Sequence, residues 1–280
     1  MMDRAAPDLV VMQGARHALN RPALYPGHRI LYDLDDADFH LPHLAGPVTE
    51  AMSDVVCVIA GSRYIADWCR GRGAEAEIVW TGTPVGSGTR RPHRTRPPVV
   101  AWAQSAPEDY TAEAEWVLTV MRQVSAQCPE MRLRFYDRRA DSPEAFLDPF
   151  KRAGLRVEWC ESAQYSHYLR SFDDVALGLA PLCPDNPFSR GKSFGKILAY
   201  LDRHVPVICS DVGEHGDFFD AATGVVSNDP TVWVGAIARL LAKAEARQNM
   251  ADRAYAAFKT RLSVDESARR LDGVLRHYLT

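Results

Sequence analysis

The sequence predicts an α/β protein with two doubly wound parallel sheets. Short apolar runs that read as buried strands alternate with amphipathic helical stretches along nearly all of its 280 residues, a rhythm typical of parallel sheets. The stretch 86–98, GSGTRRPHRTRPP, has no apolar periodicity and is typical of an interdomain linker with solvated arginines. We therefore expect two Rossmann-like domains, residues 1–88 and 89–280. The last helix is a candidate to pack back on the first domain.

Each predicted strand is a short, mostly apolar run, and each longer predicted helix carries its apolar residues on one face. Strands are expected at Asp8–Met12, Arg29–Tyr32, Val55–Ala60, Glu77–Trp80, Val99–Ala103, Leu133–Tyr136, Val157–Trp159, Val175–Leu179, Val205–Cys209 and Thr223–Val226. Helices are expected at Pro47–Ser53, from a Ser62 cap to about Arg72, and at Thr111–Gln127, Pro143–Ala153, Gln164–Ser171, Pro230–Ala244 and Asp265–Leu279.

Composition excludes several classes of protein. A net charge of −3 and the lack of a basic tail give no case for nucleic-acid binding. The six cysteines are scattered and form no C-x-x-C, so we read them as buried free thiols in a reducing compartment. No apolar run approaches the ~18 residues of a membrane span, and the first residues are no signal peptide. A cytoplasmic protein is expected.

The stretch from Pro181 to Gly213 reads as strand, polar loop, helix and strand, and it carries the most informative residues. We expect a helix beginning near Ser189 or Ser193, whose first N–H groups attract an anion. Gly191 would let a ligand approach the backbone, and Arg190, Lys192 and Lys196 would supply positive charge. The pattern favours a diphosphate site, although a solvated basic helix end is the simpler alternative. The spacing is not that of a P-loop.

Ligands in doubly wound folds bind at the carboxyl ends of the strands. That rule places the polar segments 33–36, 104–110, 181–196 and 211–216 on one functional edge. Asp33-Leu34-Asp35 is formally a D-x-D, and paired carboxylates of this kind hold Mg²⁺ or Mn²⁺ in some sugar transferases. The other readings leave the acids as caps of the following segment or as groups that act on a sugar.

Five motifs, in order, resemble glycosyltransferases of the GT-B type, family 4-like. The most specific is PFSRGKSFGKILAYLDRHVPVICS, residues 187–210, which resembles the donor-binding segment of a bacterial subgroup. YDLDDADF resembles its Asp-Asp motif, and VVAWAQSAPEDY resembles its first C-terminal strand and loop. ATGVV and DPTVW resemble two later segments. The likeness covers nearly the whole chain.

This resemblance implies two Rossmann-like domains that face each other across a cleft. The C-terminal domain would hold a nucleotide-sugar as co-substrate, without a metal or other cofactor, and transfer would retain anomeric configuration. Donor diphosphate and sugar contacts are expected from Ser189, Arg190, Gly191, Lys192, Ser193 and Lys196. Nucleotide contacts are expected from Ser105, Tyr200, Gly213 and Glu214, and catalytic roles from Asp35 and Asp36.

The chain also departs from the family. Gly191 and Ala199 stand where many relatives carry a pair of glutamates, and Gln104–Tyr110 lacks the expected cation, for which Lys192 and Lys196 would substitute. The part before residue 88 is about half as long as this domain usually is, so an incomplete N-terminal domain, or a misassigned start, is expected.

The favoured function is a hexosyltransferase-type glycosyltransferase of polysaccharide biosynthesis, acting on a glycan, lipid-linked or other cell-surface acceptor at the cytoplasmic side, with peripheral membrane association as one option. The alternatives are a non-catalytic nucleotide-sugar-binding subunit that needs a partner chain and, less favoured, a sugar epimerase of the same fold.

Overall fold

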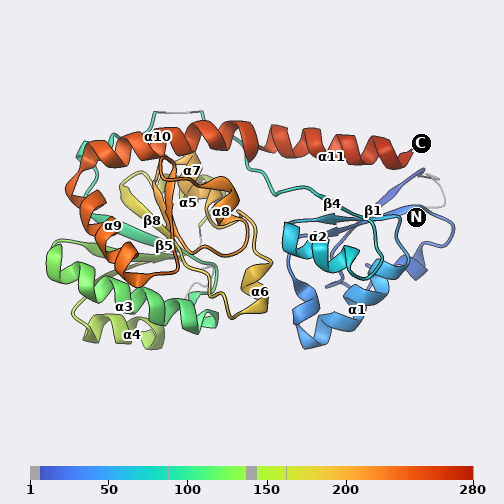
Figure 1. Ribbon diagram of the computed structural model, residues 1–280, viewed down its shortest axis with the longest axis horizontal. Helices are drawn as coiled ribbons and strands as arrows, with labels where there is room; N and C mark the ends of the chain where they lie inside the picture. The colour runs from blue at the N-terminus through green and yellow to red at the C-terminus, as the bar shows by residue number, and fades with distance from the viewer. Residues whose placement is uncertain (1–6, 88, 137–143, 162, 280) are drawn as a thin grey trace. The chain divides into compact units, whose positions relative to one another are not determined.

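The computed structural model describes residues 7–87, 89–136, 144–161 and 163–279, whose strands form two parallel sheets (Figure 1). Contacts between Cα atoms divide the chain into two compact units that interleave along the sequence. Unit 1 comprises Met1–Pro84, Pro184–Gly195 and Leu262–Thr280, and unit 2 comprises Val85–Cys183 and Lys196–Arg261. The α/β class with two parallel sheets is confirmed, whereas the domain boundary expected after residue 88 stays a prediction.

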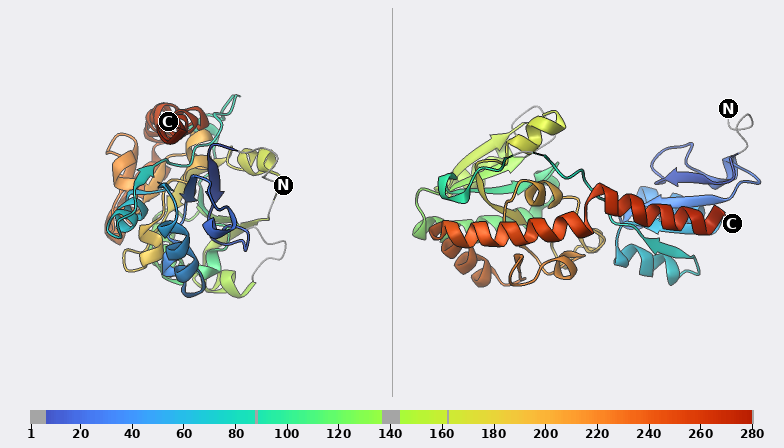
Figure 2. Two further views of the ribbon diagram at one scale, coloured as in Figure 1. Left: turned by 90° about the vertical axis from the view of Figure 1, so that its right-hand side faces the viewer. Right: turned by 90° about the horizontal axis from the view of Figure 1, so that it is seen from above.

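Unit 1 is built on four parallel strands in the order β1-β2-β3-β4. Alternate side chains of a strand point to opposite faces of the sheet. On one face, Tyr32 and Val58 pack under two helices, α1 and α2. On the other face, Leu31 and Ile59 pack against α11, which lies along the sheet (Figure 2). The elements are β1 (Val10–Gln13), β2 (Ile30–Leu34), α1 (Pro42–Ser53), β3 (Cys57–Ala60), α2 (Arg63–Arg70), β4 (Ala76–Ile78) and α11 (Val264–Leu279).

The two helices of the first face begin for different local reasons. The Ser62 hydroxyl accepts a hydrogen bond from the Ile65 N–H, which confirms the predicted cap of α2. α1 begins at Pro42 rather than at Pro47. Proline fits the first helical position because the N–H that it lacks would have no partner there.

Unit 2 is built on six parallel strands in the order β10-β9-β8-β5-β6-β7. The order reverses between β5 and β8, and ligands of doubly wound folds bind at such a reversal. α3, α4 and α9 cover one face around Trp102, Leu133 and Trp233. The elements are β5 (Val99–Ala103), α3 (Thr111–Gln127), β6 (Arg132–Tyr136), α4 (Glu144–Arg152), β7 (Arg156–Cys160), α5 (Tyr165–Arg170), β8 (Val175–Ala180), α7 (Leu198–Asp202), β9 (Val207–Cys209), α8 (His215–Phe218), β10 (Gly224–Val226), α9 (Pro230–Ala242) and α10 (Ala244–Arg261).

The described part of the stretch 86–98 is anchored to unit 2, so its arginines are not all solvated as expected. The Arg96 guanidinium is buried and donates to the Val175 carbonyl at 2.8 Å and the Arg203 carbonyl at 3.1 Å. The Arg90 Nε donates to the Asp202 carbonyl at 2.8 Å. The buried Asp202 carboxylate accepts the Gly86 N–H at 2.7 Å. Backbone acceptors thus replace water around these cations.

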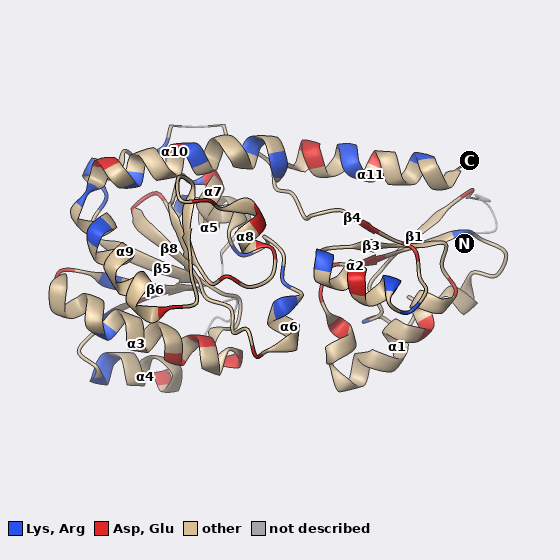
Figure 3. Ribbon diagram, in the orientation of Figure 1, with Lys and Arg blue, Asp and Glu red and all other residues tan. Residues whose placement is uncertain are grey.

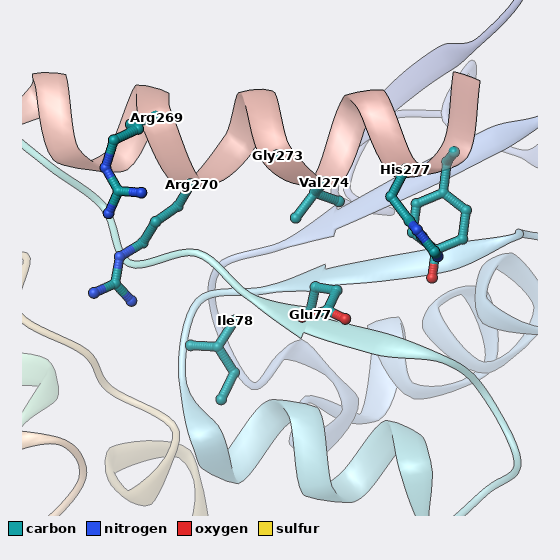
Figure 4. Close-up of a pocket in the computed structure, with 8 residues that line it drawn as sticks. Glu77, Ile78, Arg269, Arg270, Gly273, Val274 and His277 are labelled. Carbon is teal, nitrogen blue, oxygen red and sulfur yellow. The ribbon is translucent and has the colours of Figure 1, made fainter. Parts of the chain in front are cut away.

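α11 leaves an open groove of about 380 Å³ against β4 (Figure 4). Gly273 lines the groove, so a longer side chain at this position would narrow it. Nothing lies within 4 Å of the position that a Cβ on Gly273 would take. The Arg270 guanidinium lies 4.9 Å from the Trp80 ring centroid at one end.

The structure bears on two expectations that come from composition. The six cysteines are free; Cys57, Cys69 and Cys209 are buried and the others are partly buried. None of the helices formed by the described residues is long and apolar enough to cross a membrane.

Candidate functional site

The helix expected near Ser189 or Ser193 begins at neither residue. The chain instead forms a four-residue helix, α6 (Pro187–Arg190), in which the Asn186 side chain accepts the Phe188 N–H at 3.0 Å. The next helix, α7, begins only at Leu198 and has no side-chain cap. Asparagine followed by proline is a strong helix-start signal, and it outweighs the serines. The expected start of the helix is therefore wrong, and the anion site expected there stays a prediction.

The expected pairing of Lys192 and Lys196 on one helical face is also wrong. Lys192 lies in unit 1, where its ammonium is 2.7 Å from the Asp36 carboxylate. Lys196 lies in unit 2, where its ammonium donates to the Ser105 hydroxyl at 3.2 Å. Each lysine therefore belongs to the polar edge of a different sheet.

In unit 1, the polar edge is a charged cluster that follows β2. Asp36 accepts from Lys192 and, at 2.9 Å, from Arg16. Arg16 also binds both carboxylate oxygens of the buried Asp38, at 2.6 and 2.7 Å. Burial raises the pKa of Asp36, but Lys192 and Arg16 outweigh it, so the pKa is lowered. Asp36 is a carboxylate at neutral pH.

The neighbouring carboxyl groups differ in environment. Asp35 is exposed and accepts from the Thr81 hydroxyl at 2.8 Å. Asp33 lies within β2, and burial, with the nearby Asp35 charge, raises its pKa to about 6. The sequence analysis gave Asp33 no role other than in a D-x-D. Its position inside an otherwise apolar strand was the available signal for a perturbed carboxyl group.

Two glycines bring backbone segments together at this edge. A Cβ on Gly61 would lie 2.7 Å from the Asp35 carbonyl oxygen, so the turn after β3 needs glycine there. A Cβ on Gly191 would lie 2.5 Å from the Ala37 Cβ. Gly191 is therefore needed for packing against the segment after β2, and the ligand approach expected from the sequence stays a prediction.

The remaining residues of the expected donor segment lie in unit 1 as well. Ser189 is fully buried and Ser193 is half-buried. Arg190 is exposed, and its guanidinium lies 5.2 Å from the Tyr64 ring centroid. Figure 3 shows this positive charge on α6.

In unit 2, polar side chains support the loops at the ends of β5, β8 and β9. The Gln104 side chain accepts the Ser105 N–H at 2.9 Å. The Glu113 carboxylate accepts the Cys183 N–H at 2.8 Å, and the Ser210 hydroxyl accepts the Leu182 N–H at 3.0 Å. The sequence analysis missed Glu113 and Ser210, whose partners are distant in sequence. These bonds hold the strand ends beside which Lys196 lies.

Tyr200, expected to contact a nucleotide, is fully buried under the sheet. Its hydroxyl donates to the Ala101 carbonyl at 2.9 Å and accepts the Ala103 N–H at 2.7 Å. A Cβ on Gly178 would lie 2.7 Å from the Tyr200 ring, so β8 needs glycine there. This environment does not fit a nucleotide contact, and the residue instead joins α7 to β5.

The loop after β9 and the start of α8 hold the two remaining predicted nucleotide contacts, Gly213 and Glu214, and His215 beside them. Gly213 is exposed and has φ of +63°, a conformation that glycine adopts without strain. Glu214 and His215 are buried. The His215 Nδ1 lies 3.1 Å from the Ser210 carbonyl and therefore carries the proton. Burial lowers the pKa of His215 to about 4, so its ring is neutral at pH 7.

The D-x-D pattern at the end of β2 raised the alternative of a metal site. Among the described residues, no group of three or more His, Cys, Asp or Glu side chains could hold a metal ion. The Asp33-Leu34-Asp35 pattern places its two carboxyl groups in different environments, one partly buried in β2 and one exposed beside Thr81.

A scan against protein-family models found no match, and a search of curated proteins found no significant match. Solved structures do match. A variant of TarM from S. aureus, in complex with fondaparinux, alpha-GlcNAc-glycerol and UDP, has a TM-score of 0.71 at 10% identity over 91% of this chain and 52% of TarM. Sucrose-phosphate synthase from Thermosynechococcus elongatus has a TM-score of 0.73 at 15% identity, over 98% of this chain and 74% of that protein.

HepE from Anabaena, in complex with UDP and glucose, has a TM-score of 0.72 at 14% identity, over 99% of this chain and 80% of HepE. The chain spans about half the length of TarM. At these identities the likeness shows the fold, which is the GT-B fold of glycosyltransferases expected from the sequence. Membership of family 4 and an incomplete N-terminal domain stay predictions.

Proposed function

We propose that the protein is a glycosyltransferase that moves a hexose from a nucleotide-sugar to a glycan, lipid-linked or other cell-surface acceptor. One observation carries the proposal. The two parallel sheets match structures over at least 91% of the chain, and two of these, TarM and HepE, hold UDP. Transfer that retains anomeric configuration and needs no metal ion belongs to the same proposal, as does a place at the cytoplasmic side of a membrane.

The proposed diphosphate contact in unit 2 is Lys196. Its ammonium lies beside Ser105, directly after β5, at the reversal of strand order. The leaving diphosphate gains negative charge during transfer, and a fixed ammonium stabilises that charge more in the transition state than in the bound donor. Ser105, Gly213 and Glu214 are the proposed nucleotide contacts at the same edge.

The proposed catalytic carboxylates in unit 1 are Asp35 and Asp36. Asp36 stays ionised because Lys192 and Arg16 hold it, so it could stabilise positive charge that develops on the transferred sugar. The exposed Asp35 could orient sugar hydroxyls. In this proposal the main role of Lys192 is to keep Asp36 ionised. Direct contacts of Lys192, Ser189, Arg190 and Ser193 with the donor stay predictions.

The test is calorimetric titration of the full chain with UDP. Lys196→Ala should weaken UDP binding roughly tenfold or more, as expected for loss of a charged hydrogen bond. Lys243→Ala is the matched control, because Lys243 is an exposed lysine of unit 2 that follows α9, and it should bind as the wild type does. Equal affinity in Lys196→Ala would remove this lysine from the donor site. Transfer or hydrolysis of UDP-sugars by the wild type then tests the activity.

A second candidate is a nucleotide-sugar-binding subunit that needs a partner chain. The four-stranded sheet of unit 1 favours it, because Val11, which is 49% exposed, lies on its edge strand β1. In the β1–β2 ladder, the N–H groups of Val10 and Gly14 point to β2, so those of the alternate residues point outward. An outward-facing edge can pair with another chain. UDP binding without transfer or hydrolysis would select this candidate.

A further inference from the structure

Two exposed arginines of unit 1 lie on aromatic rings of the same helix. Tyr64 and Trp68 are one turn apart on α2, so they share a face of the helix. The Arg190 guanidinium carbon lies 5.2 Å from the Tyr64 ring centroid, and that of Arg72 lies 4.0 Å from the Trp68 ring centroid. We call these four residues, with Phe39 and His40, the arginine ledge.

Stacking between the Phe39 and Trp68 rings holds part of the arginine ledge in place. Their ring centroids are 3.8 Å apart and their planes differ by 6°, so the rings are fully stacked. Phe39 is buried, which fixes the Trp68 ring to the core of unit 1. Arg72 also donates to the Trp68 carbonyl at 3.3 Å. The guanidinium of Arg72 is therefore held at the surface in one orientation.

His40 joins the two halves of the ledge. Its Nε2 lies 2.8 Å from the Tyr64 hydroxyl, and its ring is 4.6 Å from the Phe39 ring. Burial lowers the pKa of His40, and the charges of Arg190 and Arg72 lower it further. The histidine is thus under the positive field of both arginines.

Neither arginine is paired with a carboxylate among the described residues. Other arginines of unit 1 do have carboxylate partners. Arg16 binds Asp36 and Asp38, and Arg70 of α2 lies 3.5 Å from Asp67. No such partner lies within ion-pair distance of Arg72 or Arg190 in the part of the chain that the structure describes, and both side chains are exposed. Two oriented cations without counter-charges form a positive surface.

A guanidinium stacked on a ring keeps its N–H groups in a planar fork, and that fork matches a carboxylate or a phosphate. Tyr64 lies in the first turn of α2, directly after β3, so the ledge begins at the strand ends where Asp35 and Asp36 lie.

We infer that the arginine ledge binds the carboxylate or phosphate group of a negatively charged glycan, which is the acceptor. The role of this glycan as the acceptor rests on the proposed function, whereas the binding of an acidic glycan does not. It assigns Arg190 to an acidic glycan rather than to the diphosphate of the donor.

The experiment is calorimetric titration of the full chain with three oligosaccharides of one length: maltotetraose, a phosphate monoester of maltotetraose, and a galacturonic acid tetrasaccharide. The wild type should bind one or both acidic probes at least tenfold more tightly than maltotetraose. The preferred probe identifies the anion as a phosphate or a carboxylate. Arg72→Gln and Arg190→Gln should each lower that affinity roughly tenfold.

Arg276→Gln is the matched control, because Arg276 is an exposed arginine of unit 1 on α11 and is paired with Asp272. It should bind the acidic probes as the wild type does. Arg72→Lys keeps the charge but loses the planar fork, so it should recover only part of the affinity. Arg72→Gln should leave UDP affinity unchanged.

Three results would overturn the inference: equal binding of neutral and acidic probes, undiminished acidic binding in both glutamine variants, or binding only to phosphatidylglycerol vesicles. If acidic binding depends on the arginines while the wild type fails to bind UDP, the proposed function fails and the ledge remains as a site for acidic glycans. If UDP binds and the acidic probes do not, only the ledge fails.

Discussion

Two groups of polar side chains, one in each unit, are held in different ways. In unit 2, Tyr200 and Arg96 are buried and tied to backbone atoms: Tyr200 binds two residues of β5, and Arg96 binds carbonyl groups of two separate segments. In unit 1, Arg16, Lys192 and Asp36 are bound to other charged side chains at a partly exposed strand end. The first arrangement fixes a framework and leaves few groups for a ligand.

The second arrangement keeps charges near the surface, where a ligand could compete for them. Backbone partners cannot move without disturbing the sheet, whereas an ion pair at a strand end can exchange partners. The difference teaches that the polar residues near a strand end are not equivalent candidates for function. The partner of each side chain, rather than its residue type, separates structural from functional groups.

The largest expected effect is on the framework of unit 2. Asp202→Ala would leave Arg90 and the Gly86 N–H without a buried carboxylate. Removing one partner of a buried pair costs about 3–5 kcal/mol, which should appear as a lower urea midpoint. Asp272→Ala, which removes an exposed pair on α11, is the control and should cost less than about 1 kcal/mol. Equal losses would erase the contrast between buried and exposed pairs.

A smaller loss is expected from Tyr200→Phe. The ring keeps its packing, but the Ala103 N–H and the Ala101 carbonyl lose a buried partner. Such a loss costs about 1–3 kcal/mol of unfolding free energy. Urea unfolding measures it, and UDP titration of the same variant should give wild-type affinity. A weaker UDP affinity with unchanged stability would return Tyr200 to the nucleotide site.

The smallest effect concerns Asp33 in unit 1. Its pKa is raised to about 6 from an ordinary 3.8 because it is buried and lies near Asp35. The folded state therefore holds a proton that the unfolded chain has released between those values, so this group lowers stability as pH rises through that window. Asp33→Asn should be more stable than the wild type at pH 7, by a fraction of the ~3 kcal/mol that a pKa of about 6 instead of 3.8 corresponds to, because Asp33 is partly exposed, and it should gain nothing at pH 3.

Urea midpoints at several pH values measure that gain. Asp67→Asn, at an exposed carboxylate of α2, is the matched control. A gain for Asp33→Asn that does not change with pH would show that its carboxyl group has an ordinary pKa.

Much of the fold could be predicted from the sequence because buried parallel strands are continuous apolar runs. β5 and α3 have the predicted bounds. α10 was missed because its buried face mixes two alanines and an arginine with only two large apolar residues, Met250 and Phe258, which gives little apolar periodicity. The four-residue α6 was missed because the Asn186 cap lies before the serines that were considered.

The candidate site could be predicted only as a set of residue types. Strand ends identify Asp36 and Ser105 as edge residues, but the Lys192–Asp36 pair joins positions 156 residues apart. No local pattern encodes such a contact. The exposed Arg190 and the buried Arg96 look alike in sequence, and only their surroundings distinguish a free cation from one that holds the framework.

The interleaved course of the chain has a practical consequence for work with separated pieces. The apolar underside of the β2–β3 pair, with Leu31 and Ile59, is covered by α11, a helix that lies far away in the sequence. A polypeptide stopped after residue 88 would leave that underside in water and should aggregate. Supplying residues 262–280 as a separate peptide should restore solubility, because these two distant segments complete one hydrophobic core.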